Sequence, residues 1–437
     1  MHLVSLNLPD LLISLWRGTI ECESTDSKDD WAWRILIGET WKELGRIIAA
    51  IAPYLPGSFD RPPRNPAEKM SSGYKAWEFL LLVFGLFPAL LEGLLPAIYW
   101  KNFCMLVFGI RLLHQREITK VELVAAHKAL VQFSEDFELL YYQRRADRLH
   151  FCRPSIHQTP HLAPESTRCG PLGLSSQWPM ERTIGNLGQE VKQPSNPYAN
   201  LSQRGLLRGQ VNAMKVMMPE LEPEPSPIPR GAIELEDEYV LLRAKDTRAR
   251  DVRPCEAECI RQYVRAEGGE CANTYVPQVT RWARLRLPNG QTARSAWKEK
   301  LKPLSRVRMA RNVKIQSGGT WEIAEVQFYF RLRLHEDDAV RSLAVVSVYD
   351  EPNAARLAAS HGTVWSSVYR GDASLRVVDI KSIRTVVAMI PYNILQHAAA
   401  LEYARGSLPG HECFLMEKPG LDIIFMGGVG EDIVDEE

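Results

Sequence analysis

The sequence lacks an apolar run long enough to cross a membrane. The longest run, from Phe79 to Leu91, has thirteen residues, contains Pro88 and is followed by Glu92, whereas a spanning helix needs about 20 residues. The N-terminus also lacks the basic region, apolar core and cleavage site of a secretory signal peptide. We therefore expect an intracellular protein with no membrane partner.

The chain has neither an excess of charge of one sign nor a pattern of paired cysteines. Its 437 residues include 53 Lys and Arg and 53 Asp and Glu, so the formal net charge is zero. This balance argues against attraction of the whole molecule to nucleic acid. The eight cysteines are scattered and follow no secretory signal, so we expect reduced thiols. With 45% hydrophobic and 24% charged residues, the composition predicts a globular protein of about two to three domains.

A phosphate-binding loop is also missing. The glycine-rich string GGVG at 427–430 has no helix after it, and a loop that binds a dinucleotide or a phosphate needs the N-terminus of such a helix. We expect a flexible tail there, ending in the acidic string EDIVDEE. No small-molecule substrate is indicated.

The first half of the chain has the periodicity of helices. The clearest helix is expected at 119–142, where Thr119 and Glu122 form a capping box before a regular apolar stripe. The string PYLPGSFDRPPRN at 53–65 is too rich in proline for a helix. The other helices expected in this half are 10–17, 31–52, 73–95, 100–113 and 205–218.

The second half changes to the periodicity of strands after a proline- and glutamate-rich linker, PELEPEPSPIPR. Val326, Phe328 and Phe330 alternate with polar neighbours, which predicts a half-buried strand. The string PNG at 288–290 predicts a hairpin between 282–287 and 291–297. Further strands are expected at 343–349, 363–369, 375–380, 383–390 and 421–426.

The predicted fold class is therefore α+β and multidomain, with a helical N-terminal half followed by a small all-β barrel or sandwich domain. We expect six segments. They are a helical region at 1–150, a segment with a further helix at 151–218, the linker at 219–238, a helical bridge at 239–278, the β-rich domain at 279–426 and the acidic tail at 427–437.

A basic segment opens the β-rich domain. Between 281 and 314 eleven Lys and Arg accompany one acid, Glu299, and two tryptophans. Cations neutralise phosphates and aromatic rings stack on bases, so a nucleic-acid interface is one interpretation. The other is a solvated strand face neutralised by the acidic residues 220–238. The candidate nucleic-acid-binding residues are Arg281, Trp282, Arg284, Arg286, Arg294, Trp297, Lys298, Lys300, Lys302, Arg306, Arg308, Arg311 and Lys314.

Four residues have the side-chain types of a zinc site, namely Cys152, His157, His161 and Cys169. Pro154 and Pro160 interrupt any single helix that carries them, and the cysteine spacing is not that of a zinc finger. Packing and hydrogen bonding of these side chains is therefore the alternative to a metal site.

A helix is also expected in SSQWPMERTIGNLGQE, because Pro179 suits a first helical turn. Met180, Ile184, Leu187 and Val191 recur at helical spacing, which predicts a buried stripe. Glu181 lies beside this stripe, where it is either a metal ligand or an ordinary carboxylate that favours the helix dipole. Gly185 and Gly188 would allow a close approach of a neighbouring element.

Long strings of the sequence carry a family resemblance. They are MHLVSLNLPDLLISLWRGTI, PYLPGSFDRPPRNPAEKMSSGYKAWEFLL, YWKNFCMLVFGIRLL, GPLGLSSQWPMERTIGNLGQE, LPNGQTARSAWKEKLKPLSRVRMARNVK, AEVQFYFRL, VVDIKSIRTVVAMIPYN and MEKPGLDI. Together they span most of the chain. The sequence resembles the part of fungal CACTA-type (En/Spm-like) DNA transposases that follows the catalytic core.

The resemblance implies that the helical half is the remnant of an RNase H-like core with its helical insertion. Such a core holds Mg²⁺ or Mn²⁺ between two Asp and one Glu, and Glu181 matches the position of the Glu. In relatives an Asp would precede the Met-His pair that begins this chain, so both core Asp residues are expected to be missing. A two-metal site needs carboxylates on both sides of the metal pair, and we therefore expect no cofactor.

The function expected from these observations is that of a transposase-derived protein, a catalytically incomplete part of a CACTA-type transposase that retains nucleic-acid or protein binding. The alternative is a domesticated, non-catalytic scaffold that binds chromatin or proteins. The expected partners are DNA or another protein, and the expected location is the nucleus.

Overall fold

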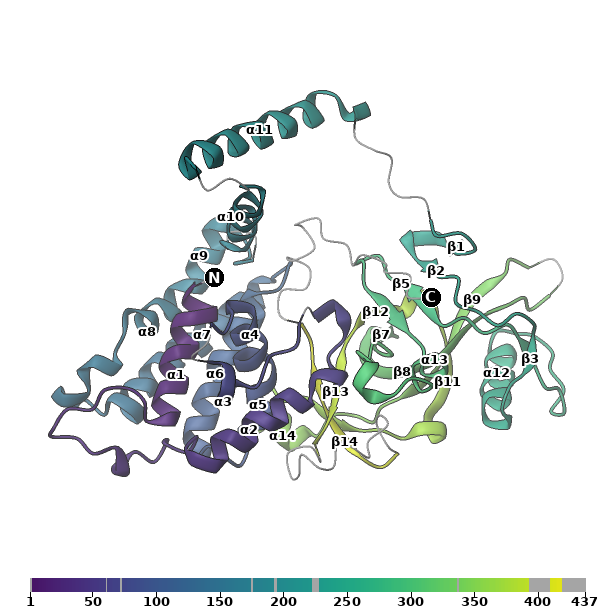
Figure 1. Cartoon of the computed structure of the whole chain (residues 1–437). Coiled ribbons are helices and arrows are strands. Elements are labelled where there is room, and N and C mark those ends of the chain that lie inside the picture. The colour runs from purple at the N-terminus through teal and green to yellow at the C-terminus, as the bar shows by residue number, and fades with distance from the viewer. Residues whose placement is uncertain are drawn as a thin grey trace.

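The computed structural model describes residues 2–59, 61–70, 73–173, 176–191, 195–221, 228–335, 338–392 and 409–418. Helices fill the N-terminal half and antiparallel sheets fill most of the C-terminal half, as Figure 1 shows. The predicted α+β class is confirmed. The strand expected at 421–426 and the acidic tail at 427–437 lie outside the described residues.

The helices of the N-terminal half follow the apolar periodicity of the sequence. The capping box of α7 is confirmed, because the Thr119 side chain accepts from the Glu122 amide and Glu122 accepts from the Thr119 amide. The α-helices are α1 (Leu8–Arg17), α2 (Gly38–Ala50), α3 (Pro66–Lys69), α4 (Ala76–Leu81), α5 (Phe87–Leu90), α6 (Ala97–Leu113), α7 (Lys120–Phe137), α8 (Pro154–Gln158), α9 (Leu162–Cys169), α10 (Trp178–Glu190) and α11 (Pro197–Met217).

The expected helix at 31–52 begins later than its sequence pattern indicates. Trp31 and Trp33 precede α2 and stack on each other in the core, with ring centroids 5.6 Å apart. These two rings contribute to the apolar periodicity of 31–52, but they lie in a turn before the helix. In the described part of the proline-rich loop at 53–65, which excludes residue 60, the helical structure is limited to two short 3₁₀ turns, Ala52–Tyr54 and Gly57–Phe59.

The sheets of the C-terminal half are antiparallel. One sheet has the order β11-β9-β8-β7-β12, a second β1-β2-β5-β6, a third β10-β14-β13, and a pair joins β3 to β4. None of these sheets closes into a barrel within the described residues. The strands are β1 (Ile233–Glu234), β2 (Val240–Leu241), β3 (Arg250–Asp251), β4 (Gln278–Val279), β5 (Arg284–Arg286), β6 (Thr292–Arg294), β7 (Asn312–Ser317), β8 (Thr320–Leu332), β9 (Arg341–Val348), β10 (Ser366–Val368), β11 (Leu375–Asp379), β12 (Ile383–Val386), β13 (Ala388–Pro391) and β14 (Glu412–Met416).

The five-stranded sheet is covered on both faces. Leu285 of β5 and Ala293 of β6 pack on one face, in the same cluster as Val326. The helix α12 (Pro254–Ala266) covers the other face. The expected helical bridge at 239–278 is therefore only partly helical, because its first residues form β2 and β3. Two short helices, α13 (Ala296–Glu299) and α14 (Ala354–Ala359), complete this half.

A β-bulge corrects the expected alternation along β8. The register with β9 shifts between Val326 and Phe328, so these two side chains lie in different core clusters. Tyr329, expected on the polar face, is fully buried on the same side as Val326. An extra residue in one strand moves the following side chains to opposite faces, which period-two counting cannot detect.

The two halves share one hydrophobic core. Met309, Val364, Ile390 and Phe414 of the C-terminal half belong to the same buried cluster as the N-terminal helices. The Arg111 guanidinium of α6 donates across the junction to the Thr363 carbonyl at 2.7 Å. The halves therefore pack against each other over an apolar contact.

Candidate functional site

The basic segment 281–314 runs through β5, β6 and α13 to β7, and one of its cations is buried at the centre of an ion cluster. Arg311 Nε donates to Glu325 Oε1 at 2.7 Å, and its Nη1 lies 3.5 Å from Glu299 Oε2. Lys300 Nζ donates to the other Glu325 oxygen at 3.0 Å, and the Tyr369 hydroxyl also donates to it. The Arg311 side chain is only 2% exposed, so it is closed to a phosphate.

The cluster shifts the pKa values of its two carboxylates, Glu325 and Glu299, in opposite directions. Burial alone would raise the pKa of Glu325, but Arg311, Lys300 and the Tyr369 hydrogen bond lower that pKa to about 2. Burial raises the pKa of Glu299 and outweighs the attraction of Arg311. Glu299 Oε2 accepts no hydrogen bond from any described residue. Arg311 therefore interacts more strongly with Glu325 than with Glu299.

Other cations of the segment bind inside the chain as well. Arg281 pairs with Asp246 at 2.8 Å, and Lys314 pairs with Glu417 at 2.7 Å. Arg308 reaches the proline-rich loop of the helical half, where Nε donates to the Leu55 carbonyl at 2.6 Å and Nη2 to the Pro56 carbonyl at 2.8 Å. These contacts fix the segment to its own protein.

The two tryptophans of the segment differ in access. Trp282 is only 3% exposed and its backbone pairs with Tyr329, so its ring belongs to the core and does not stack on bases. Trp297 is half-buried, with the Arg281 guanidinium 4.6 Å and the Lys298 ammonium 4.3 Å from its ring centroid. Its ring already contacts two cations of this chain.

The rest of the segment is scattered. Arg284 lies directly opposite Arg294 on the β5–β6 hairpin, and Arg286 follows on the same face. Lys302 and Arg306 are exposed in the loop before β7. Arg286, Arg294 and Arg306 form no ion pair with any residue that the structure describes. The eleven cations thus do not form one continuous basic surface.

Glu181 lies in the first turn of α10, as expected, but the buried stripe predicted for this helix is wrong. Met180 is 52% and Ile184 55% exposed. Nothing lies within 4 Å of a Cβ built on Gly185 or Gly188. Among the described side chains of α10, only Trp178 at the start of the helix packs against the core. The apolar spacing reflects an amphipathic helix whose apolar face is open to solvent.

The four zinc-type residues are brought together only in part. His157 and His161 approach with their Nε2 atoms 3.3 Å apart, whereas Cys152 is half-buried elsewhere and Cys169 is exposed at the end of α9. Across the described parts of the chain, no group of three or more His, Cys, Asp or Glu side chains could hold a metal ion. Glu181 therefore has no pair of carboxylates beside it there. All eight cysteines are free thiols.

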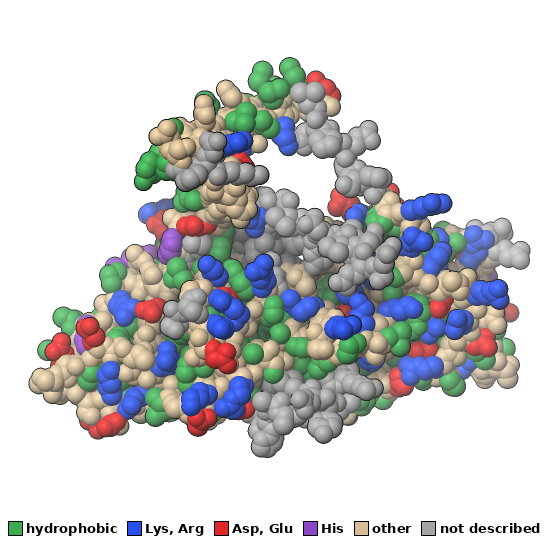
Figure 2. Space-filling view, viewed as in Figure 1, with side chains coloured by type: hydrophobic (Ala, Val, Ile, Leu, Met, Phe, Trp, Pro, Cys, Tyr) green, Lys and Arg blue, Asp and Glu red, His purple; other side chains and the backbone are tan. Residues whose placement is uncertain are grey.

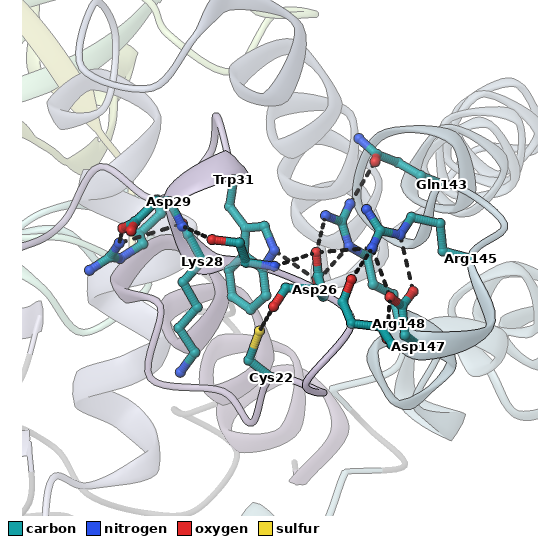
Figure 3. A network of polar contacts seen from close by, with 12 residues as sticks. Cys22, Asp26, Lys28, Asp29, Trp31, Gln143, Arg145, Asp147 and Arg148 are labelled. Carbon is teal, nitrogen blue, oxygen red and sulfur yellow. Dashed lines mark hydrogen bonds and ion pairs between the residues drawn. The ribbon is translucent and has the colours of Figure 1, made fainter.

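A second buried ion network joins Asp26, in the loop after α1, to Arg148 and is drawn in Figure 3. Arg148 donates to both Asp26 oxygens, at 2.6 and 2.7 Å, and the Trp31 indole donates to Asp26 at 2.9 Å. Hydrogen bonds from Arg148 lower the pKa of Asp26. The Asp26 side chain is 1% and the Arg148 side chain 2% exposed, so this network is structural and no substrate reaches it.

Helix α11, expected from the sequence only at 205–218, carries an exposed apolar face. Every residue of this 21-residue helix is at least partly exposed. Leu207, Val211 and Met214 recur every three or four residues and form one stripe, here called the α11 stripe. In Figures 1 and 2 the helix lies apart from the body of the molecule, with hydrophobic side chains along its length.

The middle of α11 is joined to α10 by an ion pair. Arg208 pairs with Glu190 at the end of α10, which joins the two helices into one arm. No Asp or Glu occurs within α11, whereas Arg204, Arg208 and Lys215 lie along one edge of the α11 stripe at helical spacing. The lack of acids was the sequence signal that could have identified this helix as a binding element.

A cavity of about 810 Å³ lies at the junction of the two halves. Its floor is apolar, with Leu44, Ile47 and Leu90, and Arg356 crosses it to pair with Glu92 and Glu412. Arg356 pairs with both Glu92 and Glu412 across the junction. We therefore attribute the cavity to the contact between the two halves and not to a ligand site.

Within the described residues, no helix is both long and apolar enough to traverse a bilayer. Comparisons with protein-family models, curated proteins and solved structures found no match to this chain.

Proposed function

We propose that the chain is a non-catalytic binding protein that inserts the α11 stripe into an acidic, apolar-lined groove of a protein partner. The exposure of the whole apolar face of α11 carries the proposal. Helices of globular proteins gain most of their stability by burying an amphipathic face, and α11 buries none of its residues in this chain. A contiguous exposed apolar surface is typical of an interaction site.

The chemistry of α11 selects the partner. An amphipathic helix that lays anchors at i, i+4 and i+7 into a groove is a recurring mode of peptide recognition. Methionine side chains adapt to irregular apolar grooves, and Met214, Met217 and Met218 are all exposed. Arg204, which is exposed beside the stripe, favours a carboxylate at the rim of that groove.

Calcium-loaded calmodulin is a suitable probe, because its grooves are rich in methionine and bind amphipathic helices. We expect the full chain to bind it, and the Leu207→Asp/Val211→Asp variant to lose at least roughly 100-fold in affinity by placing charges in an apolar groove. Ser202→Asp/Asn212→Asp adds the same charge to the opposite face and should bind within a few fold of the parent, measured by fluorescence anisotropy.

Sedimentation of the free chain separates the alternatives. A dimer that dissociates in Leu207→Asp/Val211→Asp would replace the groove by a second copy of this chain. Failure of the monomeric parent chain to bind the probe at micromolar concentration, or equal binding by both double variants, would contradict the proposal.

The resemblance to CACTA-type transposases supports the same class of function and adds a descent from DNA-acting enzymes, with a nuclear location. Nucleic-acid binding is the second candidate. It rests on the β5–β6 hairpin, where Arg284 faces Arg294. Arg286 and Arg294 of this hairpin form no ion pair with any described residue, and such cations favour phosphates.

A further inference from the structure

His157 and His161 form a pair whose geometry differs from that of the other histidines described. Both side chains are exposed, on α8 and on the 3₁₀ turn Thr159–His161 that follows it. Their Nε2 atoms are 3.3 Å apart, and their ring centroids are 4.9 Å apart. This separation is within the range of a hydrogen bond between the two rings.

This separation also suits a shared metal ion. Imidazole nitrogens lie about 2.0–2.1 Å from Zn²⁺, so two nitrogens bound to one such ion are about 3.0–3.4 Å apart for angles between octahedral and tetrahedral. Small rotations of the two exposed rings would direct both lone pairs to one point. When both Nε2 atoms bind the metal, each neutral ring carries its proton on Nδ1.

The backbone beneath the pair is held in place by buried neighbours. Thr159, between the two histidines, is fully buried, and its hydroxyl donates to the Ile156 carbonyl at 2.8 Å. Ser134 of α7 contacts the same hydroxyl at 2.8 Å. Ala163 is buried on the far side of His161. The spacing of the two rings is therefore set before any ligand arrives, which reduces the entropy lost on binding.

We infer that His157 and His161 form a two-histidine site for a divalent transition-metal ion. Imidazole suits Cu²⁺, Ni²⁺ and Zn²⁺. Since no third His, Cys, Asp or Glu joins the pair among the described residues, water completes the coordination. The site excludes Cys152 and Cys169, which the sequence pattern had included, and it is independent of the α11 stripe.

The test is calorimetric titration of the full chain with NiCl₂ under nitrogen. One site should be found, and His157→Ala and His161→Ala should each weaken it at least roughly 10-fold, because the second imidazole binds intramolecularly. His335→Ala, which removes an exposed histidine of the β half, should leave the titration unchanged. Affinity should be highest for Cu²⁺, as the Irving–Williams order requires.

Co²⁺ gives an independent readout of the ligands. Two imidazoles with water should give weak d–d absorption without the intense near-ultraviolet band of a thiolate ligand. Such a thiolate band would overturn the inference and restore a cysteine site. Equal Ni²⁺ binding by the parent, His157→Ala and His161→Ala would overturn it as well. Circular dichroism shows whether each variant is folded, and exposed side chains make that the expected result.

Discussion

The basic segment 281–314 and helix α11 both combine cations with apolar side chains, but the fold uses them in opposite ways. In the segment, Arg311 and Trp282 are buried and Arg308 binds the backbone of the helical half. In α11 the apolar side chains are exposed, and Arg208 pairs with Glu190 of α10. Charge density in a sequence therefore does not by itself identify a binding surface.

The difference arises from the partners that the fold supplies. The segment crosses β5 to β7, where buried carboxylates such as Glu325 require cations, since an unpaired buried charge costs several kcal/mol. Helix α11 lies apart from the body, so no described element covers its apolar face. A segment is available for binding only where its own chain leaves it without partners.

The largest expected effect is in the ion cluster of the segment. Arg311→Met should lower the free energy of unfolding by about 3–5 kcal/mol, because it leaves the buried Glu325 carboxylate without its closest cation. Urea denaturation measures this loss. Arg306→Ala removes an exposed cation of the same segment and should change stability by about 0.5 kcal/mol or less. Equal losses of unfolding free energy in Arg311→Met and Arg306→Ala would show that Arg311 is as solvated as Arg306.

The same cluster predicts a pH dependence of stability. Since the pKa of Glu325 is lowered from 4.5 to about 2 by folding, its ionised form stabilises the protein above the unfolded pKa. That contribution should be lost as the pH falls from 4.5 toward 2. Glu299, whose pKa is raised, contributes with the opposite sign. Below pH 4.5 the free energy of unfolding should fall less steeply with pH in Glu325→Gln than in the parent protein. Identical slopes would contradict the assigned ion pairs.

The contact between the segment and the helical half has a smaller expected effect. Arg308→Ala removes charged hydrogen bonds to Leu55 and Pro56, and should cost about 1.5–3 kcal/mol in urea denaturation. Lys302→Ala, in the exposed loop nearby, is the matched control. If Arg308→Ala were as stable as the control, the segment would not anchor the proline-rich loop.

Salt dependence sharpens the comparison for nucleic acid. Eleven open cations would give a slope of log affinity against log salt of about 8–10 in magnitude. Arg286, Arg294 and Arg306 form neither an ion pair nor a cation–π contact in the described structure, and these three alone would give only about 2–3. Anisotropy of a labelled duplex at several salt concentrations gives this slope. A steep slope that persists after Arg286, Arg294 and Arg306 are all replaced by alanine would show that the other cations of the segment also bind nucleic acid.

Sequence periodicity predicted the element types well where one feature dominates locally. The capping box at Thr119 and the hairpin at Gly290, whose φ is +81° as its turn requires, are both local. Hydrogen bonds such as the one from Leu287 to Gln291 close that turn within a few residues. Local chemistry of this kind can be recognised without knowing the tertiary contacts.

Long-range contacts account for what was missed. The bulge at Gln327 is set by pairing with β9, and the burial of Arg311 depends on Glu325 in another strand. The stripe around Ile184 has the spacing of a core helix, but only tertiary structure shows that Met180 and Ile184 are exposed. Periodicity reports which face is apolar and not what covers that face.

Hydroxyl-radical footprinting of the free chain tests the central difference most directly. Met214 and Met217 of α11 are 51% and 77% exposed, whereas Met309 of the basic segment is 2% exposed. We predict rapid oxidation of the two α11 methionines and strong protection of Met309. Protection of Met214 and Met217 equal to that of Met309 would contradict the account, because α11 would then be covered in the free protein.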